Sequence, residues 1–235
     1  MSYTELADRL PRKLRRHILH FEVEIEDAVI AFARGLPDGA RVLDAGAGEG
    51  QYRRHFSRQR YCGVDLAVGD RSWDYSGLDA IGDLSALPFR DAAFDAALHI
   101  VTIEHLKEPA RALGEISRVA RTGAMLLIAA PHEWEVHQAP HDYFRYTRYG
   151  LAHLLEKAGY EVVEMRAVGG YFRLLARRLL NGLQFFSSGI RWVWFVPAAI
   201  LAAPAAMILP FLDSLDHEKN FTLGYLCWAR KTERS

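Results

Sequence analysis

The sequence predicts an α/β fold in which helices pack on a sheet of buried strands. Segments 41–45 and 61–65 are short and rich in apolar residues, which is typical of parallel strands that are buried on both faces. Glycines recur at every second position after the first segment, and glycine permits tight turns that a ligand can approach closely. A chain of 235 residues can bury a substantial core. We therefore expect a single domain over residues 1–235.

Composition and charge narrow the class of protein further. The chain has 29 basic and 29 acidic residues, so no overall positive field indicates a nucleic-acid partner. Cys62 and Cys227 lie in apolar segments. We expect packed thiols there, not a disulfide or a metal site, which indicates a reducing compartment. The N-terminus lacks the apolar region of a signal peptide, so a cytoplasmic location is expected.

Residues 1–38 are expected to form two helices that precede the first strand. In segment 4–18 an apolar residue recurs at every fourth position, and basic residues cover much of the remaining surface. The apolar positions are Leu6, Leu10, Leu14 and Ile18. This helix either packs on the domain with a solvated basic face or lies on an anionic lipid surface. A second helix is predicted over 21–34, with Gly35 and Pro37 as its stop signal.

The first strand leads through Asp44 into a turn that carries Gly46, Gly48 and Gly50. A helix from about Gln51 to residue 60 would direct its N-terminus toward the same ligand. Strand, turn and helix together predict a nucleotide-type binding site. The spacing G-x-G-x-G differs from the G-x-G-x-x-G of dinucleotide-binding sites, which disfavours a nicotinamide-dependent dehydrogenase.

This segment resembles motif I of the class I S-adenosylmethionine-dependent methyltransferases, h-h-D-x-G-x-G-x-G, in which h is apolar. A second strand ends in Asp65, about twenty residues after Gly46, as in nucleotide-binding βαβ units. A carboxylate at this point can accept hydrogen bonds from both hydroxyls of a ribose. Some acids in such positions only cap a turn; we expect Asp65 to bind the ribose.

The most specific resemblance lies in segment 82–95, which reads G-D-L-x-x-L-P-F-x-D-x-x-F-D. It is similar to the adenine loop and fourth strand of the ubiquinone/menaquinone-methyltransferase-like group, methyltransferase type 11. In that group the acid that matches Asp83 accepts the adenine amino group, and the backbone N–H that matches Leu84 contacts a ring nitrogen. Segments 103–106 and 116–119 match the group's L-E-H-h and E-h-x-R-V-L motifs.

The resemblance covers about residues 40–170 and implies both a fold and a cofactor. The implied fold is a Rossmann-like, seven-stranded sheet with six parallel strands, an antiparallel seventh strand and helices on both faces. The implied cofactor is S-adenosyl-L-methionine. The predicted cofactor-binding residues are Asp44, Gly46, Ala47, Gly48, Gln51, Asp65, Leu66, Asp83, Leu84 and His99.

The remaining elements follow in chain order. The third, fifth, sixth and seventh strands are expected at 78–84, 125–130, 160–166 and 221–230, and the fourth lies within the segment 87–99 that contains part of the signature above. Pro109 is expected in the first turn of a helix that Gly123 ends. A further helix that begins near Tyr149 resembles one of the group and ends at Gly159.

Segment 131–147 is expected to face the methyl acceptor, because class I methyltransferases use the loops after the fourth and fifth strands for this purpose. The segment is unusually rich in His, Tyr, Trp and acidic residues for a connection. Some of these could bind a divalent metal ion. The residues concerned are His132, His137, His141 and Asp142. Their spacing matches no metal motif, so no metal is assigned.

A histidine of this segment could instead act as a general base, because its pKa lies near neutrality. We expect His141 or His137 in this role, with Tyr143 orienting the acceptor. The alternative is that these side chains only pack the loop and shape the pocket.

Residues 168–220 form a hydrophobic insertion between the sixth and seventh strands, far longer than an ordinary loop. A basic amphipathic helix is expected at 173–191, and 192–212 then carries no charge over about the length that spans a bilayer. A single crossing would leave the seventh strand on the wrong side of the membrane. Three prolines also interrupt the apolar stretch: Pro197, Pro204 and Pro210. We expect a helical hairpin that enters one leaflet, closes over the acceptor as a lid or forms the face of a homodimer.

The leading functional prediction is an S-adenosylmethionine-dependent methyltransferase that acts on a small, apolar or lipid-linked acceptor. Its expected location is the cytoplasm, including the inner face of the membrane. One alternative is a soluble natural-product or sugar methyltransferase with the insertion as lid or dimer face. An alternative of another class is a non-catalytic S-adenosylmethionine-binding interaction module.

Overall fold

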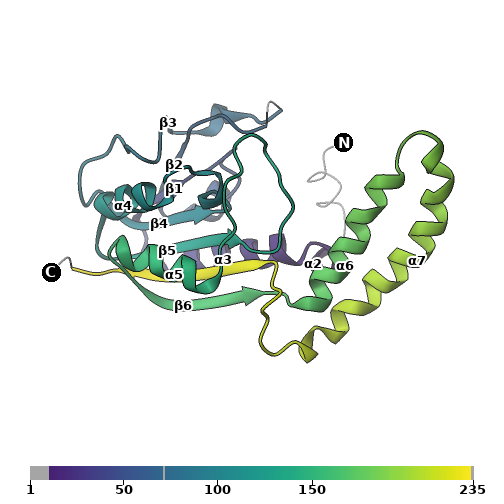
Figure 1. Ribbon diagram of the computed structural model, residues 1–235. Coiled ribbons are helices and arrows are strands. Elements are labelled where there is room, and N and C mark those ends of the chain that lie inside the picture. The colour runs from purple at the N-terminus through teal and green to yellow at the C-terminus, as the bar shows by residue number, and fades with distance from the viewer. Residues whose placement is uncertain (1–10, 71, 234–235) are drawn as a thin grey trace. The chain divides into compact units, whose positions relative to one another are not determined.

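The computed structural model describes residues 11–70 and 72–233. It contains a seven-stranded sheet with the strand order β3-β2-β1-β4-β5-β7-β6 (Figure 1). The strands are β1 (Arg41–Ala45), β2 (Arg60–Asp65), β3 (Ala80–Ile81), β4 (Phe94–Ile100), β5 (Ala120–Pro131), β6 (Tyr160–Val168) and β7 (Gly224–Lys231). Six strands are parallel and β7 is antiparallel, so the predicted Rossmann-like sheet is confirmed.

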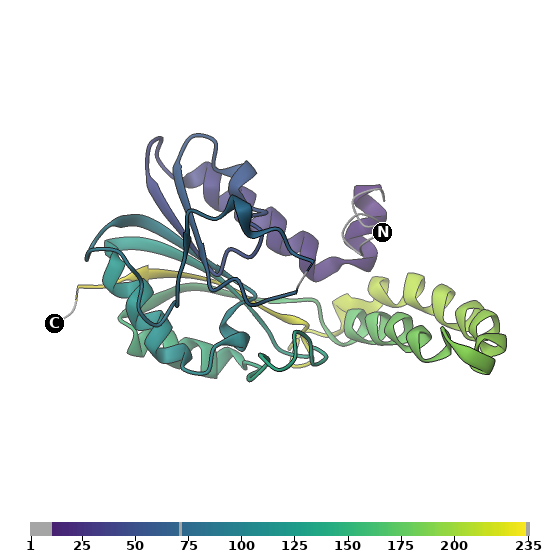
Figure 2. The ribbon, with the colours of Figure 1, turned by 90° about the horizontal axis from the view of Figure 1, so that it is seen from above.

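Helices cover both faces of this sheet (Figure 2). The part of α3 (His20–Gly35) from Ile25 on lies on one face, and α4 (Pro109–Val119) and α5 (Arg148–Lys157) lie on the other. The core of the sheet consists of apolar side chains without solvent exposure. They include Val42, Leu43, Leu98, Leu126 and Leu127.

Parallel pairing brings the carboxyl ends of the central strands to one edge of the sheet. In β1, Asp44 lies opposite Gly63 of β2 and Leu98 of β4. In β2, Asp65 lies opposite Ile81 of β3. The loops that follow these strands therefore share one edge, which is where open α/β sheets bind their ligands.

The prediction of a helix from about Gln51 to residue 60 is wrong. The connection contains only the 3-10 helix η1 (Arg53–His55) before β2 begins. The glycine turn uses the first residues of the connection, and Arg60 is already in register with Arg41 at the opposite edge of the sheet. The chain therefore has too few residues between the two strands for a longer helix.

Two other predicted boundaries differ from the structure. β5 begins at Ala120, directly after α4, so Gly123 does not end that helix. It lies within β5 with a φ of +80°, and the pairing of β4 with β5 shifts register at this point, as glycine-containing β-bulges allow. The third strand is restricted to two residues because Asp83 accepts a hydrogen bond from the Ser85 N–H at 2.7 Å, which turns the chain.

Internal contacts divide the chain into two compact units. One unit comprises Ile25–Arg166 together with the residues from Tyr225 on, and it contains the cofactor motifs. The other comprises 11–24 and Ala167–Gly224.

The second unit contains the predicted helical hairpin. Its elements are α2 (Arg12–Ile18), α6 (Tyr171–Gly182), η4 (Leu183–Phe186), η5 (Gly189–Trp194), α7 (Phe195–Ile208) and η6 (Leu209–Leu215). α6 and α7 pack side by side (Figure 2). Nε2 of His17 in α2 lies 2.7 Å from the carbonyl oxygen of Met207 in α7. Of the helix predicted over 4–18, the residues before 11 lie outside the described part of the chain.

The helix expected at 173–191 is shorter in the structure. α6 ends at Gly182, and Gly189 has a φ of +63° between the 3-10 turns that follow. Two glycines within one predicted helix weaken it, because glycine loses the most backbone entropy in a helix and tolerates turns that other residues avoid.

Two carboxylates fix the start of α6. Asp213 is 7 % exposed and accepts hydrogen bonds from the N–H groups of Gly170 and Arg173, each at 3.1 Å. Asp216 accepts a hydrogen bond from the Tyr171 N–H at 2.7 Å. Acidic side chains at a helix N-terminus satisfy its free N–H groups and interact favourably with the helix dipole. The end of η6 therefore closes the base of the hairpin.

The apolar part of the hairpin is long and exposed. Gly189–Leu215 comprises 27 residues, and its most apolar window has a mean hydropathy of 2.1 with only 17 % of that window buried. By length and composition this segment could cross a membrane. The exposed side chains include Ile190, Trp192, Trp194, Leu201 and Phe211. Their exposure distinguishes this segment from the core helix of a globular protein.

Candidate functional site

The turn after β1 requires glycine at three positions. Gly46, Gly48 and Gly50 have φ values of +90°, +54° and +73°, a region that residues with a Cβ rarely adopt. The N–H of Gly46 donates to the Val64 carbonyl oxygen at 2.8 Å, which holds the turn against β2. A Cβ on Gly46 would collide with the side chain of Thr102, which follows β4. The turn therefore presents bare backbone at the edge of the sheet, as a nucleotide site needs.

Asp65 lies at the end of β2 and binds this turn. Its carboxylate accepts hydrogen bonds from the N–H of Gly48 at 2.9 Å and from the N–H of Ala67 at 2.8 Å. A carboxylate has about four acceptor positions, so two remain for ribose hydroxyls. Leu66, the next residue, is 49 % exposed. The predicted ribose acid and the predicted glycine turn are thus in direct contact.

Asp83 and Leu84 follow β3, the neighbour of β2. The N–H of Gly82 donates to the carbonyl oxygen of Asp65 at 2.9 Å, so the two predicted cofactor acids come from adjacent strand ends. Asp83 is exposed and Leu84 is 4 % exposed. Ala47 is buried within the turn, and Gln51 is exposed directly after it.

Asp44 and His99 are both fully buried. The Tyr61 hydroxyl donates to Asp44 at 2.5 Å, yet burial raises the pKa of Asp44 to about 7. Nδ1 of His99 donates to the carbonyl oxygen of Ala45 at 2.6 Å, and burial lowers the pKa of His99 to about 4, so its imidazole is neutral. These side chains brace the strand that carries the turn. Their contact with the cofactor stays a prediction.

The loop after β5 folds back onto the residues that follow β4. The N–H groups of Tyr143 and Phe144 donate to the carbonyl oxygen of Glu104 at 2.9 and 3.2 Å. Nδ1 of His105 donates to the carbonyl oxygen of His141 at 2.5 Å. Because Glu104 and His105 belong to the 3-10 helix η3 after β4, the two loops that the sequence assigns to the acceptor form one structure.

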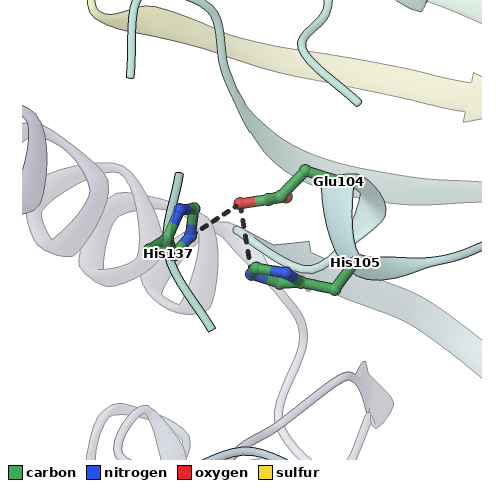
Figure 3. A group of neighbouring side chains, drawn as sticks. All are labelled: Glu104, His105 and His137. Carbon is green, nitrogen blue, oxygen red and sulfur yellow. Dashed lines mark ion pairs between the residues drawn. The ribbon is translucent and has the colours of Figure 1, made fainter. Parts of the chain in front are cut away.

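Glu104, His105 and His137 converge at this junction (Figure 3). Oε1 of Glu104 lies 3.7 Å from Nε2 of His105 and 3.8 Å from Nε2 of His137. The Glu104 side chain is 0 % exposed, and neither of its carboxylate oxygens has a hydrogen-bond partner among the described residues. Burial raises the pKa of Glu104 to about 8. A buried, unsatisfied carboxylate is costly, and such groups concentrate at functional sites.

Asp142 and Arg145 fix the position of His137. The Arg145 guanidinium donates to both carboxylate oxygens of Asp142, at 2.5 and 2.8 Å, and lowers the pKa of Asp142 to about 2. The N–H of His137 donates to Asp142 at 2.8 Å, and Nδ1 of His137 lies 3.5 Å from the same oxygen. The carboxylate thus orients this imidazole from its Nδ1 side.

The predicted acceptor residues fall into two groups. Nδ1 of His141 lies 3.3 Å from the hydroxyl of Tyr143, and the residue Tyr143 is 36 % exposed. His137 belongs instead to the cluster with Glu104. His132 belongs to neither group, because its Nδ1 lies 3.0 Å from the carbonyl oxygen of Tyr146.

Glu104 and His105 are the residues that sequence reasoning missed as site residues. In the sequence they are only part of a family motif after the fourth strand. The available signal was an acid followed by a histidine at the carboxyl end of a buried strand, where ligands bind in α/β sheets. Their contact with His137 could not be read from spacing, because 33 residues separate Glu104 from His137 in the chain.

The strand order, the glycine turn and the acid at the end of β2 define a Rossmann-like fold of the class I methyltransferase type. Residues 43–128 match the family described as "Methyltransferase domain". This match, together with relatives named as methyltransferases, confirms the predicted methyltransferase domain, enzyme class and cofactor, S-adenosyl-L-methionine, for this part of the chain.

Named relatives differ in their acceptors. A tRNA (carboxymethyluridine(34)-5-O)-methyltransferase of Arabidopsis thaliana is 32 % identical over 109 residues, which cover 43 % of this chain and 26 % of the relative. A demethylmenaquinone methyltransferase of Renibacterium salmoninarum is 33 % identical over 110 residues, which cover 43 % of this chain and 45 % of the relative. The chain therefore spans less than half the length of these two relatives, and the family does not determine its acceptor.

Among solved structures, the cyclase SpnF matches with a TM-score of 0.59 at 24 % identity, over 89 % of this chain and 81 % of that one. At this identity the likeness establishes the fold alone. Function must be argued from the site, because one fold hosts several chemistries.

Proposed function

We propose that this chain transfers a methyl group from S-adenosyl-L-methionine to an apolar or lipid-linked small molecule at the cytoplasmic face of a membrane. The observation that carries the choice of acceptor is the exposed, apolar hairpin segment Gly189–Leu215, which has no charge over residues 192–212, in a chain with a methyltransferase domain. The proposal has two parts, the identity of the methyl donor and the class of the methyl acceptor, and different residues support each part.

The donor side rests on the glycine turn, Asp65 and Asp83. The glycines of the turn let a ligand approach the backbone closely, and the two acids stand at adjacent strand ends where a nucleoside can bind across them. The sulfonium of the donor already activates its methyl group. Methyl transfer is an in-line displacement, so much of the acceleration can come from positioning the two reactants.

The acceptor side rests on the hairpin. Ile190, Leu201 and Phe211 are 89, 77 and 76 % exposed, and such an apolar surface on a protein in water is typical of an interaction site. Trp192 and Trp194 are also exposed, and Trp is enriched at membrane–water interfaces. The hairpin returns to β7 of the sheet, so a monotopic contact with one leaflet fits the chain better than a crossing.

We propose His141 as the general base for an acceptor that carries a proton, with Tyr143 orienting that acceptor. Replacing His141 by Ala is expected to lower kcat by about 10²–10⁴, because the proton would have to leave without a positioned base. Steady-state kinetics at several pH values measure this. His153→Ala, an exposed histidine of α5, is the matched control. A change in KM without a change in kcat would contradict the general-base role and would show that His141 only shapes the pocket.

The acceptor class can be tested with methyl-labelled S-adenosylmethionine. The protein is incubated with a lipid extract or with an aqueous metabolite extract, and labelled products are identified by mass spectrometry. We expect label in the lipid fraction, and its loss when residues 190–212 are replaced by a short Gly/Ser loop. Label in a water-soluble product that is independent of this replacement would favour a soluble methyltransferase. Tight S-adenosylhomocysteine binding without any labelled product would favour a binding module.

A further inference from the structure

The cluster of Glu104, His105 and His137 brings three electron-pair donors together inside the protein. The ligating atoms of the three side chains all lie within 4.8 Å of one another. They come from two separate loops, after β4 and after β5, which the hydrogen bonds of Glu104 and His105 to the second loop hold together. The proximity is therefore built by the fold and is not a feature of one flexible side chain.

Hydrogen bonding fixes which nitrogen of each imidazole carries a proton. Nδ1 of His105 lies 2.5 Å from the carbonyl oxygen of His141, which can only accept, so this nitrogen is the donor. Nδ1 of His137 faces the carbonyl oxygen of Glu135 at 3.1 Å and Asp142 at 3.5 Å, which are again acceptors. In the neutral imidazoles, Nε2 therefore has a free lone pair, and in both histidines it is Nε2 that faces Glu104.

A hydrogen bond inside the cluster does not explain this arrangement. The two distances from Glu104 to the imidazoles are 3.7 and 3.8 Å, well beyond the 2.7–3.2 Å of an N–H···O bond. In the described part of the chain, neither Oε atom of Glu104 nor Nε2 of His105 has another hydrogen-bond partner. When Glu104 is ionised, its carboxylate faces the lone pairs of two imidazoles, and a cation between the three groups would remove their mutual repulsion.

We propose that Glu104, His105 and His137 bind a divalent transition-metal ion of the zinc type. Two imidazoles and one carboxylate are a common ligand set for zinc and non-haem iron sites that keep positions open for other ligands. Tetrahedral bonds of about 2.0–2.1 Å place ligand atoms about 3.4 Å apart, close to the Glu104–imidazole distances of 3.7 and 3.8 Å. Nε2 coordination with Nδ1 bonded to a carbonyl or carboxylate is the usual outer-shell arrangement of metal-binding histidines.

The proposed metal ligands differ from the candidate ligands that the sequence alone indicates. Of the residues His132, His137, His141 and Asp142, only His137 is a ligand in this proposal. Asp142 lies behind His137 and is held by Arg145, so it orients a ligand instead of binding the ion. An ion at this point would offer an open position for an oxygen atom at the edge of the sheet where the acceptor loops meet. A role in holding the methyl acceptor rests on the proposed function; binding of the ion does not.

Zinc titration of the full chain tests this inference without cofactor or acceptor. The protein is stripped with a chelator and titrated calorimetrically with Zn²⁺, and Co²⁺ serves as a spectroscopic probe of the ligand geometry. We expect one Zn²⁺ per chain, and at least about a hundredfold weaker binding in Glu104→Gln and in His137→Ala, beyond the 10–100-fold effect typical of outer-shell residues. His132→Ala and His153→Ala are matched controls that retain the wild-type affinity.

Two further measurements, the Tm and the affinity for S-adenosylhomocysteine, distinguish loss of metal binding from loss of folding. Zn²⁺ should raise the Tm of the wild type and not that of Glu104→Gln, while S-adenosylhomocysteine affinity reports that the variants are folded. Wild-type affinity in Glu104→Gln, or equal weakening in His132→Ala, would overturn the assignment. Zinc binding with no methyl transfer would leave the metal site standing and refute the proposed activity, whereas methyl transfer without zinc binding would do the reverse.

Discussion

At the scale of single residues, Asp65 and Glu104 show how surroundings decide what a carboxylate can bind. Asp65 accepts two backbone N–H groups beside the glycine turn and has acceptor positions left for hydroxyl donors. Glu104 faces the unprotonated sides of two imidazoles and accepts no hydrogen bond from any described residue. The first arrangement suits a ribose, and the second suits a cation.

Replacing Asp65 by Ala is expected to weaken S-adenosylhomocysteine binding at least tenfold. A hydrogen bond to a charged group contributes about 1.5–3 kcal/mol, and about 1.4 kcal/mol already corresponds to a factor of ten. The substitution also releases the Gly48 N–H, so the turn itself becomes less ordered. Calorimetric titration measures the affinity, with Asp38→Ala as a control at a carboxylate that is 72 % exposed. Unchanged affinity in Asp65→Ala would remove Asp65 from the cofactor site.

Asp44 predicts a pH dependence of stability. Its pKa is raised from 3.8 to about 7 by burial, so the folded state keeps a proton that the unfolded state has already lost. The contribution of Asp44 to the free energy of unfolding should therefore be largest below pH ~4 and fall as the pH rises to about 7, by at most about 1.4 kcal/mol per pH unit. In Asp44→Asn, which cannot ionise, this part of the slope should vanish. Urea unfolding of both proteins at several pH values measures it, and identical slopes would contradict the prediction.

At the scale of elements, local patterns predicted the strands well and long-range contacts poorly. The strand positions and the stop at Gly35 follow from hydrophobicity and glycine placement, which neighbouring residues determine. The helix after Gly50 failed because the register of β2 limits the length of the connection. The cap of α6 by Asp213 and the approach of His137 to Glu104 join residues far apart in the chain. No single-sequence pattern contains such a pairing.

Asp213 makes the hairpin testable as an element. Replacing it by Ala removes the acceptor of the Gly170 and Arg173 N–H groups, and loss of such a cap typically costs about 0.5–2 kcal/mol. We expect faster hydrogen exchange in the first turns of α6, with S-adenosylhomocysteine affinity preserved because the cofactor motifs lie outside this unit. Ser214→Ala, at an exposed neighbour, is the control. Unchanged protection of the Arg173 and Leu174 amides would show that the cap contributes nothing.

At the scale of the whole molecule, equal numbers of acidic and basic residues coexist with a very uneven distribution of apolar surface. The 29 acids balance the 29 basic residues, so no net charge draws the chain to a polyanion. The uncharged stretch 192–212 is preceded directly by Arg191, and the basic residues of α2 belong to the same unit. Apolar contact with modest electrostatic assistance is the combination expected of a peripheral membrane protein.

Vesicle binding is therefore the prediction for the molecule as a whole. Apolar burial is worth about 25 cal/mol per Å², so a few inserted Trp, Phe and Leu side chains supply several kcal/mol. Arginines near anionic headgroups add about 1 kcal/mol each, and salt should weaken only this part. We expect the wild type to co-sediment with anionic liposomes, and Leu201→Asp combined with Phe211→Asp to remain in the supernatant. Both side chains are exposed, so the double substitution leaves the hairpin core intact.

Tyr149→Asp is the matched control, because Tyr149 is 78 % exposed but lies on α5, outside the hairpin. It should bind vesicles like the wild type. If the wild type itself stays in the supernatant at low salt, the hairpin does not bind lipid. Sedimentation equilibrium would then decide between its other uses, because a dimer face predicts a dimer that Leu201→Asp with Phe211→Asp dissociates, and a lid predicts a monomer in both proteins.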